Sequence, residues 1–187
     1  LIIEWATAII NGIKKYSPVD NDVSVFGKIL RNEIDEEFRF VQKQLKETVA
    51  ELLRVYLKGK YPLKRDDDIT GIIKKRMAGH ILEEEFVDII KYMYNRDDSV
   101  AILLRLNDTR EKQLMEYKES IRGSRHVIKP EDEQNAQKLA YAEFCKILLD
   151  FQLSGHEKFL HRFVALFRKF DQDRNGIVNE EEFTDVV

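Results

Sequence analysis

Oxygen-bearing residues recur at fixed offsets in the stretch "DQDRNGIVNEEEF", residues 171–183. Calcium takes about six to eight oxygen ligands, and a 12-residue loop can supply them at positions 1, 3, 5, 7, 9 and 12 around a glycine at position 6. Counted from position 171, Gly176 falls at the sixth position, where the sharp turn requires a positive φ. The candidate ligands are Asp171, Asp173, Asn175, Ile177 through its backbone carbonyl, Asn179 and Glu182.

This stretch resembles an EF-hand of the calmodulin-like superfamily, since every ligand position matches. Predicted helices flank it, in "HEKFLHRFVALFRKF" before it and "EEEFTDVV" after it. The resemblance implies one bound Ca²⁺, with a dissociation constant of micromolar order for three carboxylates and an asparagine. It also implies that Val178, at loop position 8, forms a short backbone ladder with a partner loop.

Two further stretches match the second half of the same loop pattern. In residues 132–143, Leu139 takes position 8 and Glu143 position 12. The first half has Asp132 and Gln134, but it has Ala136 at position 5 and no glycine at position 6. We expect this stretch to be a degenerate partner of the loop at 171–182. Residues 74–85 fit more weakly: "GHILEEEF" parallels "GIVNEEEF", but Lys74 and Arg76 at positions 1 and 3 would repel calcium. This second stretch is either a decayed hand or a simple helix–turn–helix.

The elements that must position these loops are helices, so we expect an all-α fold. Apolar residues recur at helical spacing along most of the chain, and no stretch alternates with period two over a strand's length. Helices are predicted over 2–16, ending before Pro18, and over 22–56, a single run of roughly nine turns. "KGKYPLK" at 58–64 ends that long helix, and the Asp66–Asp68 triplet is predicted to begin the next one.

Later helices are predicted around 86–94, from "DDSVAILLRL" onward, and again from Asp108. Two phenylalanine-rich segments, 144–151 and 159–170, are predicted as separate helices. These expectations divide the chain into a helical region with one long helix (1–60), a second helical region (61–127), and a pair of hands, one degenerate and one intact (128–187). Trp5 and the isoleucines of the first helix are expected either in a core or in a groove formed by the hands.

Other residues that could suggest metal binding or catalysis do not form a recognisable site. "HEKFLH" is similar to a zinc-protease signature, but His156 and His161 are five residues apart and cannot share one metal from a single helix. Cys145 lies on an apolar stripe and is expected to be an inert core residue. No nucleophile motif or phosphate-binding glycine loop is visible, so we do not expect an enzyme.

Composition and charge limit the kinds of partner and the cell compartment that we expect for this protein. The net charge is −3 with both signs interspersed, which gives no reason to expect a nucleic-acid partner. No apolar run reaches the roughly 18 residues of a membrane span. One cysteine fits a reducing, cytoplasmic compartment. Because the sequence begins without Met and stops within a predicted helix, we expect it to be part of a longer protein.

Two hypotheses for the function follow. The first is a calcium-binding adaptor, in which the ion changes a surface that binds a helix of another protein. The alternative is a structural helical scaffold in a cytoskeletal or ciliary assembly, where calcium only stiffens one corner. The low methionine content, three residues, argues against a promiscuous target groove. The sequence does not indicate the oligomeric state or the identity of the partner.

Overall fold

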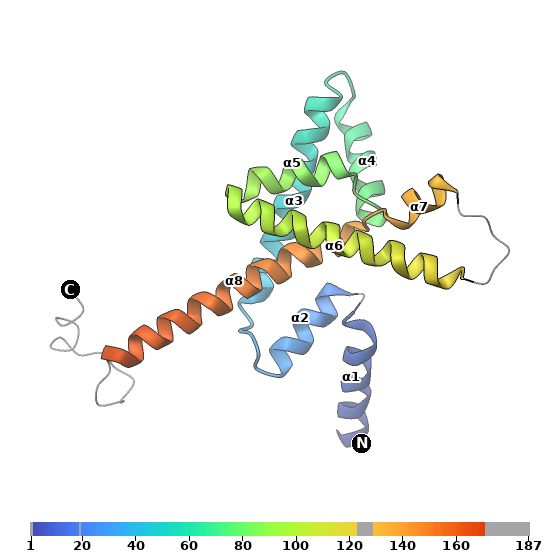
Figure 1. Cartoon of the computed structure of the whole chain (residues 1–187). Coiled ribbons are helices and arrows are strands. Elements are labelled where there is room, and N and C mark those ends of the chain that lie inside the picture. The colour runs from blue at the N-terminus through green and yellow to red at the C-terminus, as the bar shows by residue number, and fades with distance from the viewer. Residues whose placement is uncertain (1, 19, 123–128, 171–187) are drawn as a thin grey trace. The chain divides into compact units, whose positions relative to one another are not determined.

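The structure is a computed structural model that describes residues 2–18, 20–122 and 129–170 (Figure 1). Within these residues the fold is all-α, as predicted, and the only β-type pairing is an isolated bridge between His80 and Ala140. The helices are α1 (Ile2–Tyr16), α2 (Asn21–Leu30), α3 (Phe38–Lys60), α4 (Asp66–Ala78), α5 (Glu83–Met93), α6 (Arg96–Ser120), α7 (Pro130–Ala136) and α8 (Tyr141–Phe170).

The first two helices are joined by a tight, capped connection. Helix α1 ends before Pro18, as predicted, and the carboxylate of Asp20 caps α2 by accepting from the backbone N–H groups of Asp22 (2.8 Å) and Val23 (3.2 Å). Helix α1 approaches α2 closely at Gly27, where an added Cβ would lie 2.6 Å from a methyl carbon of Ile13. A larger residue at that position would push the two helices apart.

The predicted continuous helix over 22–56 is wrong, because the chain leaves the helix at residue 31. Asn32 adopts φ 54°, in the left-handed region that asparagine tolerates better than most residues. Its N–H donates to the carbonyl of Ile29 (3.0 Å), and that of Glu33 donates to Lys28 (2.9 Å). These two bonds form a Schellman motif, which ends α2 without glycine or proline.

Helix α3 supplies the central apolar stripe of the core. Leu45, Val49, Leu53 and Leu57 recur every four residues and are almost completely buried. Helices α4 and α5 pack against α3, and α5 also packs against α6. The other fully buried apolar side chains are Ile69, Ile89, Ile90, Ile102, Leu106, Leu139, Phe144 and Leu148.

Two further predicted helix boundaries are also wrong. Helix α6 begins at an Asn95 cap, whose side-chain oxygen accepts from the N–H of Asp98 (2.9 Å), and it continues through Asp108 without a break. Asp108 is therefore an ordinary helical residue. Helix α8 runs through Ser154 and Gly155, so the two predicted phenylalanine-rich helices are one helix. Without proline, nothing in that segment prevents the helix from continuing.

The chain divides into two compact units, residues 1–149 and 150–187. The described part of the second unit is the remainder of α8, in which Phe159, Phe163 and Leu166 are more than half exposed. In the first unit, α1 has no buried residue, and Ile2, with Trp5, is mostly exposed. The expectation that α1 contributes to a core is therefore wrong for the described residues. No helix in the described ranges is both long and apolar enough to cross a membrane.

Candidate functional site

The predicted calcium loop lies outside the described residues. This applies to each of its candidate ligands: Asp171, Asp173, Asn175, Ile177, Asn179 and Glu182. The described residues end with α8 at Phe170, directly before these ligands, and they include the apolar face of that helix. Phe159 and Phe163 stack with ring centroids 6.3 Å apart, and the Phe163 and Phe167 rings are separated by the same distance. Phe159 and Phe163 are exposed and Phe167 is half-buried, and this row of aromatic rings directly precedes the predicted metal loop.

The two partial matches to the loop pattern meet in space. The connection between α4 and α5 (79–82) lies beside the connection between α7 and α8 (137–140) (Figure 1). The N–H of Ile81 donates to the carbonyl of Leu139 (3.1 Å), and the N–H of Tyr141 donates to the carbonyl of Gly79 (3.0 Å). This antiparallel register places Ile81 opposite Leu139, and both side chains are buried.

Ile81 and Leu139 both occupy position 8 of their 12-residue patterns. The sequence led us to expect a pairing of residues 132–143 with 171–182, whereas in the described part of the chain Leu139 pairs with residues 79–81. The helices that leave the two connections are also in contact. Phe86 and Phe144, each directly following a glutamate at position 12, have ring centroids 6.0 Å apart. The two helix–connection–helix units therefore share one apolar core.

Neither connection has the backbone of a metal-binding loop. Helix α4 continues to Ala78 and α7 to Ala136, so the first five positions of both patterns are helical. Gly79, at position 6 of the first pattern, has φ −137° rather than the positive φ of a sharp loop turn. Among the described residues, no group of three or more His, Cys, Asp or Glu side chains is arranged to hold a metal ion.

The helices on either side of the first connection are joined instead by an ion pair whose carboxylate is buried and whose guanidinium is partly exposed. Glu85, at position 12, is only 1% exposed, and its two carboxylate oxygens lie 3.0 and 2.9 Å from Nε of Arg76. The N–H of Leu82 donates to one of these oxygens (3.0 Å). A buried carboxylate requires such compensation, because its desolvation is costly when it is unpaired. Arg76, which the sequence marked only as repelling calcium, is the partner of this carboxylate.

A second arginine, Arg110 of α6, links the two connections. Its Nη1 lies 3.0 Å from the carboxylate of Glu83, and its Nε donates to the backbone carbonyl of Gln137 (3.2 Å). Glu84, between Glu83 and Glu85, forms an ion pair with Lys60 of α3. Its hydrogen bond raises the pKa of Lys60. Each carboxylate of the triplet 83–85 thus pairs with a cation from a different helix.

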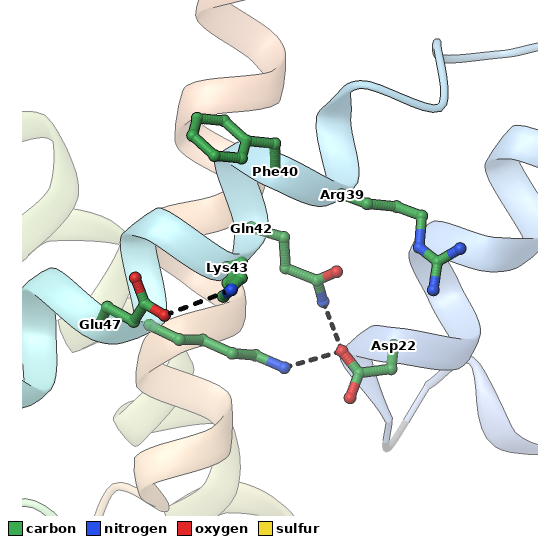
Figure 2. A pocket seen from close by; sticks show the side chains of 7 residues that line it. Asp22, Arg39, Phe40, Gln42, Lys43 and Glu47 are labelled. Atoms are coloured by element: carbon green, nitrogen blue, oxygen red, sulfur yellow. Dashed lines mark hydrogen bonds and ion pairs between the residues drawn. The ribbon is translucent and has the colours of Figure 1, made fainter.

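Figure 2 shows a separate pocket of about 470 Å³ between α2 and α3. The carboxylate of Asp22 accepts from Nε2 of Gln42 (2.8 Å) and Nζ of Lys46 (2.7 Å), and Lys43 lies 3.8 Å from Glu47. The fifth charged lining residue, Arg39, pairs with Glu36 at 3.8 Å. The contacts of Asp22 with Gln42 and Lys46 hold α2 against α3, so this pocket has a structural explanation.

The remaining candidates from the sequence are Cys145 and the histidines. Cys145 is buried, as predicted, and burial raises the pKa of its thiol to about 11, which disfavours the reactive thiolate. His156 and His161 are both exposed. The backbone of His80 forms the bridge with Ala140, and His126 lies outside the described residues.

Comparisons with protein-family models, with curated proteins and with solved structures found no match. The resemblance to EF-hands therefore depends on the residues of this chain alone. Sequence reasoning identified neither the pair of Arg76 with Glu85 nor the contacts of Arg110. The available signal was the departure from the loop pattern itself: a cation at position 3 together with a glutamate retained at position 12.

Proposed function

We propose that the chain is a calcium-binding interaction module in which one Ca²⁺ binds at residues 171–182. The observation that carries this proposal is the spacing of Asp171, Asp173, Asn175 and Glu182 around Gly176. The proposed ligands also include the carbonyl of Ile177 and the side chain of Asn179. Support comes from the two other stretches with partial loop patterns, since their position-8 residues pair with each other.

The proposed interaction surface is the aromatic row on α8. Phe159 and Phe163 are 65% and 53% exposed, and their helix leads directly into the proposed calcium loop. Calcium binding draws together carboxylates that repel one another in the metal-free protein, and it changes the orientation of the flanking helices. A partner that buries this row needs an apolar face of its own, as an amphipathic helix of another protein has.

A structural scaffold is the second candidate, and the three ion pairs at residues 83–85 favour it. They join α5 to α3, α4 and α6 without any metal. In this form of the proposal the chain is a helical element of a cytoplasmic, cytoskeletal or ciliary assembly, and calcium braces one corner only.

Calorimetric titration of calcium into metal-free protein separates these candidates. We expect one ion per chain, with a dissociation constant of micromolar order. Glu182→Gln should abolish binding, because it removes the bidentate ligand. Glu181→Gln is the matched control, since it removes an adjacent charge outside the ligand positions. Absence of binding in the unsubstituted protein would refute the calcium proposal.

The fluorescence of Trp5, the single tryptophan, and an apolar-surface dye should be recorded in the same titration. A rise in dye signal that Glu182→Gln abolishes would support the interaction module. Binding of one ion with no dye change would favour the structural brace. A blue shift of Trp5 emission with calcium would indicate that α1 becomes covered, in this chain or by association of two chains.

A further inference from the structure

The buried carboxylate of Glu85 raises the question of how the paired connections respond to calcium. Both of its oxygens are engaged by Arg76, and one also accepts from the N–H of Leu82. A metal ion could reach this carboxylate only by displacing the guanidinium. The exchange would place a second cation beside Arg76 in a region of low dielectric, where like charges repel strongly.

Arg110 provides the corresponding link between the two connections. It joins Glu83 at the start of α5 to the carbonyl of Gln137 at the end of α7, and its side chain is mostly buried. The backbone bonds of Ile81 and Tyr141 lie between the same two segments. Arg110 therefore holds the two connections together in addition to the bridge, and Arg76 holds α4 to α5 across the first connection.

We propose that these paired connections are a cation-independent brace, in which Arg76 and Arg110 supply the positive charge that a bound metal supplies in a calcium loop. The brace keeps the same structure with and without calcium, so the surfaces of α3 to α6 are presented constitutively. The inference rests on the proposed function in one respect only: it assigns every calcium response of the chain to residues 171–182.

Amide hydrogen exchange of the full chain at Ile81 and Tyr141 tests this proposal. Their N–H groups make the two bonds of the bridge, so their exchange rates measure its opening. In the unsubstituted protein the rates should agree within about twofold between EDTA and saturating calcium. Arg76→Met should raise them by about 100-fold or more, because the buried charge of Glu85 loses its partner. Calcium should not reverse that increase.

Arg65→Met is the matched control, since Arg65 is the residue directly before α4 and pairs with Asp68 while its side chain is 83% exposed. Its effect should be small. If Arg76→Met does not fold, the double variant Arg76→Met/Glu85→Met provides a second route. It replaces the ion pair with apolar side chains, and should restore slow exchange that is still insensitive to calcium.

The outcomes separate this inference from the proposed function. Slower exchange at Ile81 and Tyr141 in calcium, in both the unsubstituted protein and Glu182→Gln, would show that the connections bind the ion and would overturn the brace. Slowing that Glu182→Gln abolishes would also overturn it, because the brace would then respond to the site at 171–182. Equal exchange in Arg76→Met and Arg65→Met would overturn the role of Arg76. Absence of calcium binding to the whole chain, with the expected Arg76→Met effect, would refute the proposed function and support the brace.

Discussion

The two paired units, α4–α5 and α7–α8, meet in matching register but are stabilised differently. The first has an entering helix of 13 residues that buries Ile69 and Ile73, and it contains its own ion pair between Arg76 and Glu85. The second has an entering helix of 7 residues with no buried residue. Its position-12 glutamate, Glu143, is intermediate in exposure rather than buried.

The α7–α8 unit is instead held in place by side chains of a neighbouring helix, α6. Arg110 of α6 donates to Gln137, and Lys118 of α6 pairs with Glu133 of α7 at 2.9 Å. A seven-residue helix cannot be stable alone, because helices of that length do not overcome the cost of nucleation. The same backbone pairing is thus stabilised in two ways: by an ion pair to a buried carboxylate within α4–α5, and by hydrogen bonds and ion pairs from α6 to α7–α8.

Phe144→Ala should have the largest effect, since this residue belongs to the core that both units share. Phe144 is completely buried and contacts Phe86, so truncation should leave a cavity and lower the free energy of unfolding by about 3–5 kcal/mol. Chemical denaturation checks the value, and exchange at residues 79–82 and 137–140 should rise together. A rise confined to one connection would mean that the units open independently. Phe163→Ala, at an exposed position on α8, is the control and should cost about 0.5 kcal/mol or less.

Arg76→Met should lower the free energy of unfolding by about 3–5 kcal/mol, because a buried carboxylate is left unpaired. Glu85→Met alone should cost less, since Arg76 is about a quarter exposed and can turn toward water. The double variant should fall within about 1–2 kcal/mol of the unsubstituted protein. These values come from denaturation of the four proteins as a double-mutant cycle. A coupling energy near zero would mean that the Arg76–Glu85 pair does not stabilise α4–α5, and the proposed difference from α7–α8 would then be lost.

Much of the helical fold could be predicted from periodicity, but the ends of helices depended on capping. Ser17-Pro18 and the Asp66–Asp68 triplet marked real boundaries, because proline and first-turn acids act locally. The break after α2 was missed because asparagine, rather than glycine, occupies the left-handed position at residue 32. Asp108 suggested a helix start, but α6 runs unbroken from Arg96 to Ser120, and no proline or glycine interrupts it there.

The candidate site was predictable only in part. The patterns at 74–85 and 132–143 correctly placed Ile81 and Leu139 at equivalent positions, because the loop pattern is a local property. Which pattern pairs with which is decided by tertiary packing: proximity in sequence suggested that 132–143 pairs with 171–182, which lies outside the described residues, whereas Leu139 pairs with residues 79–81. The pair of Arg76 with Glu85 left a signal in the loop pattern, a cation at position 3 and a glutamate at position 12. The role of Arg110 depends on side chains that come together only in the folded chain, and no spacing rule identifies it.

Arg110→Ala should destabilise the α7–α8 unit more than the α4–α5 unit, and it therefore tests whether the two are stabilised differently. It removes the donor to the Gln137 carbonyl, and the free energy of unfolding should fall by about 1–2 kcal/mol. The ion pair with Glu83 adds little, because that carboxylate is 64% exposed. Exchange should increase in residues 133–138 more than in 76–82. An equal increase in both segments would show that the first unit also depends on α6, contrary to the difference described above. Lys112→Ala, two residues further along the same helix, is the matched surface control, since its side chain is 78% exposed and its ion pair with Glu116 is 3.9 Å long.

The Lys118–Glu133 pair should have the smallest effect, and it tests whether the outer tie of α7 is electrostatic. Both side chains are about 40% exposed, so Glu133→Gln should lower the free energy of unfolding by only about 0.5 kcal/mol or less. That small difference should disappear near 1 M salt, where the screening length falls to about 3 Å. Denaturation of the variant and the unsubstituted protein at low and high salt measures it. A larger loss that persists in salt would mean that the Glu133 side chain stabilises α7 by a route other than its ion pair with Lys118. The short helix would then depend on its own capping rather than on α6, and the proposed contrast with α4–α5 would no longer hold at this end of the unit.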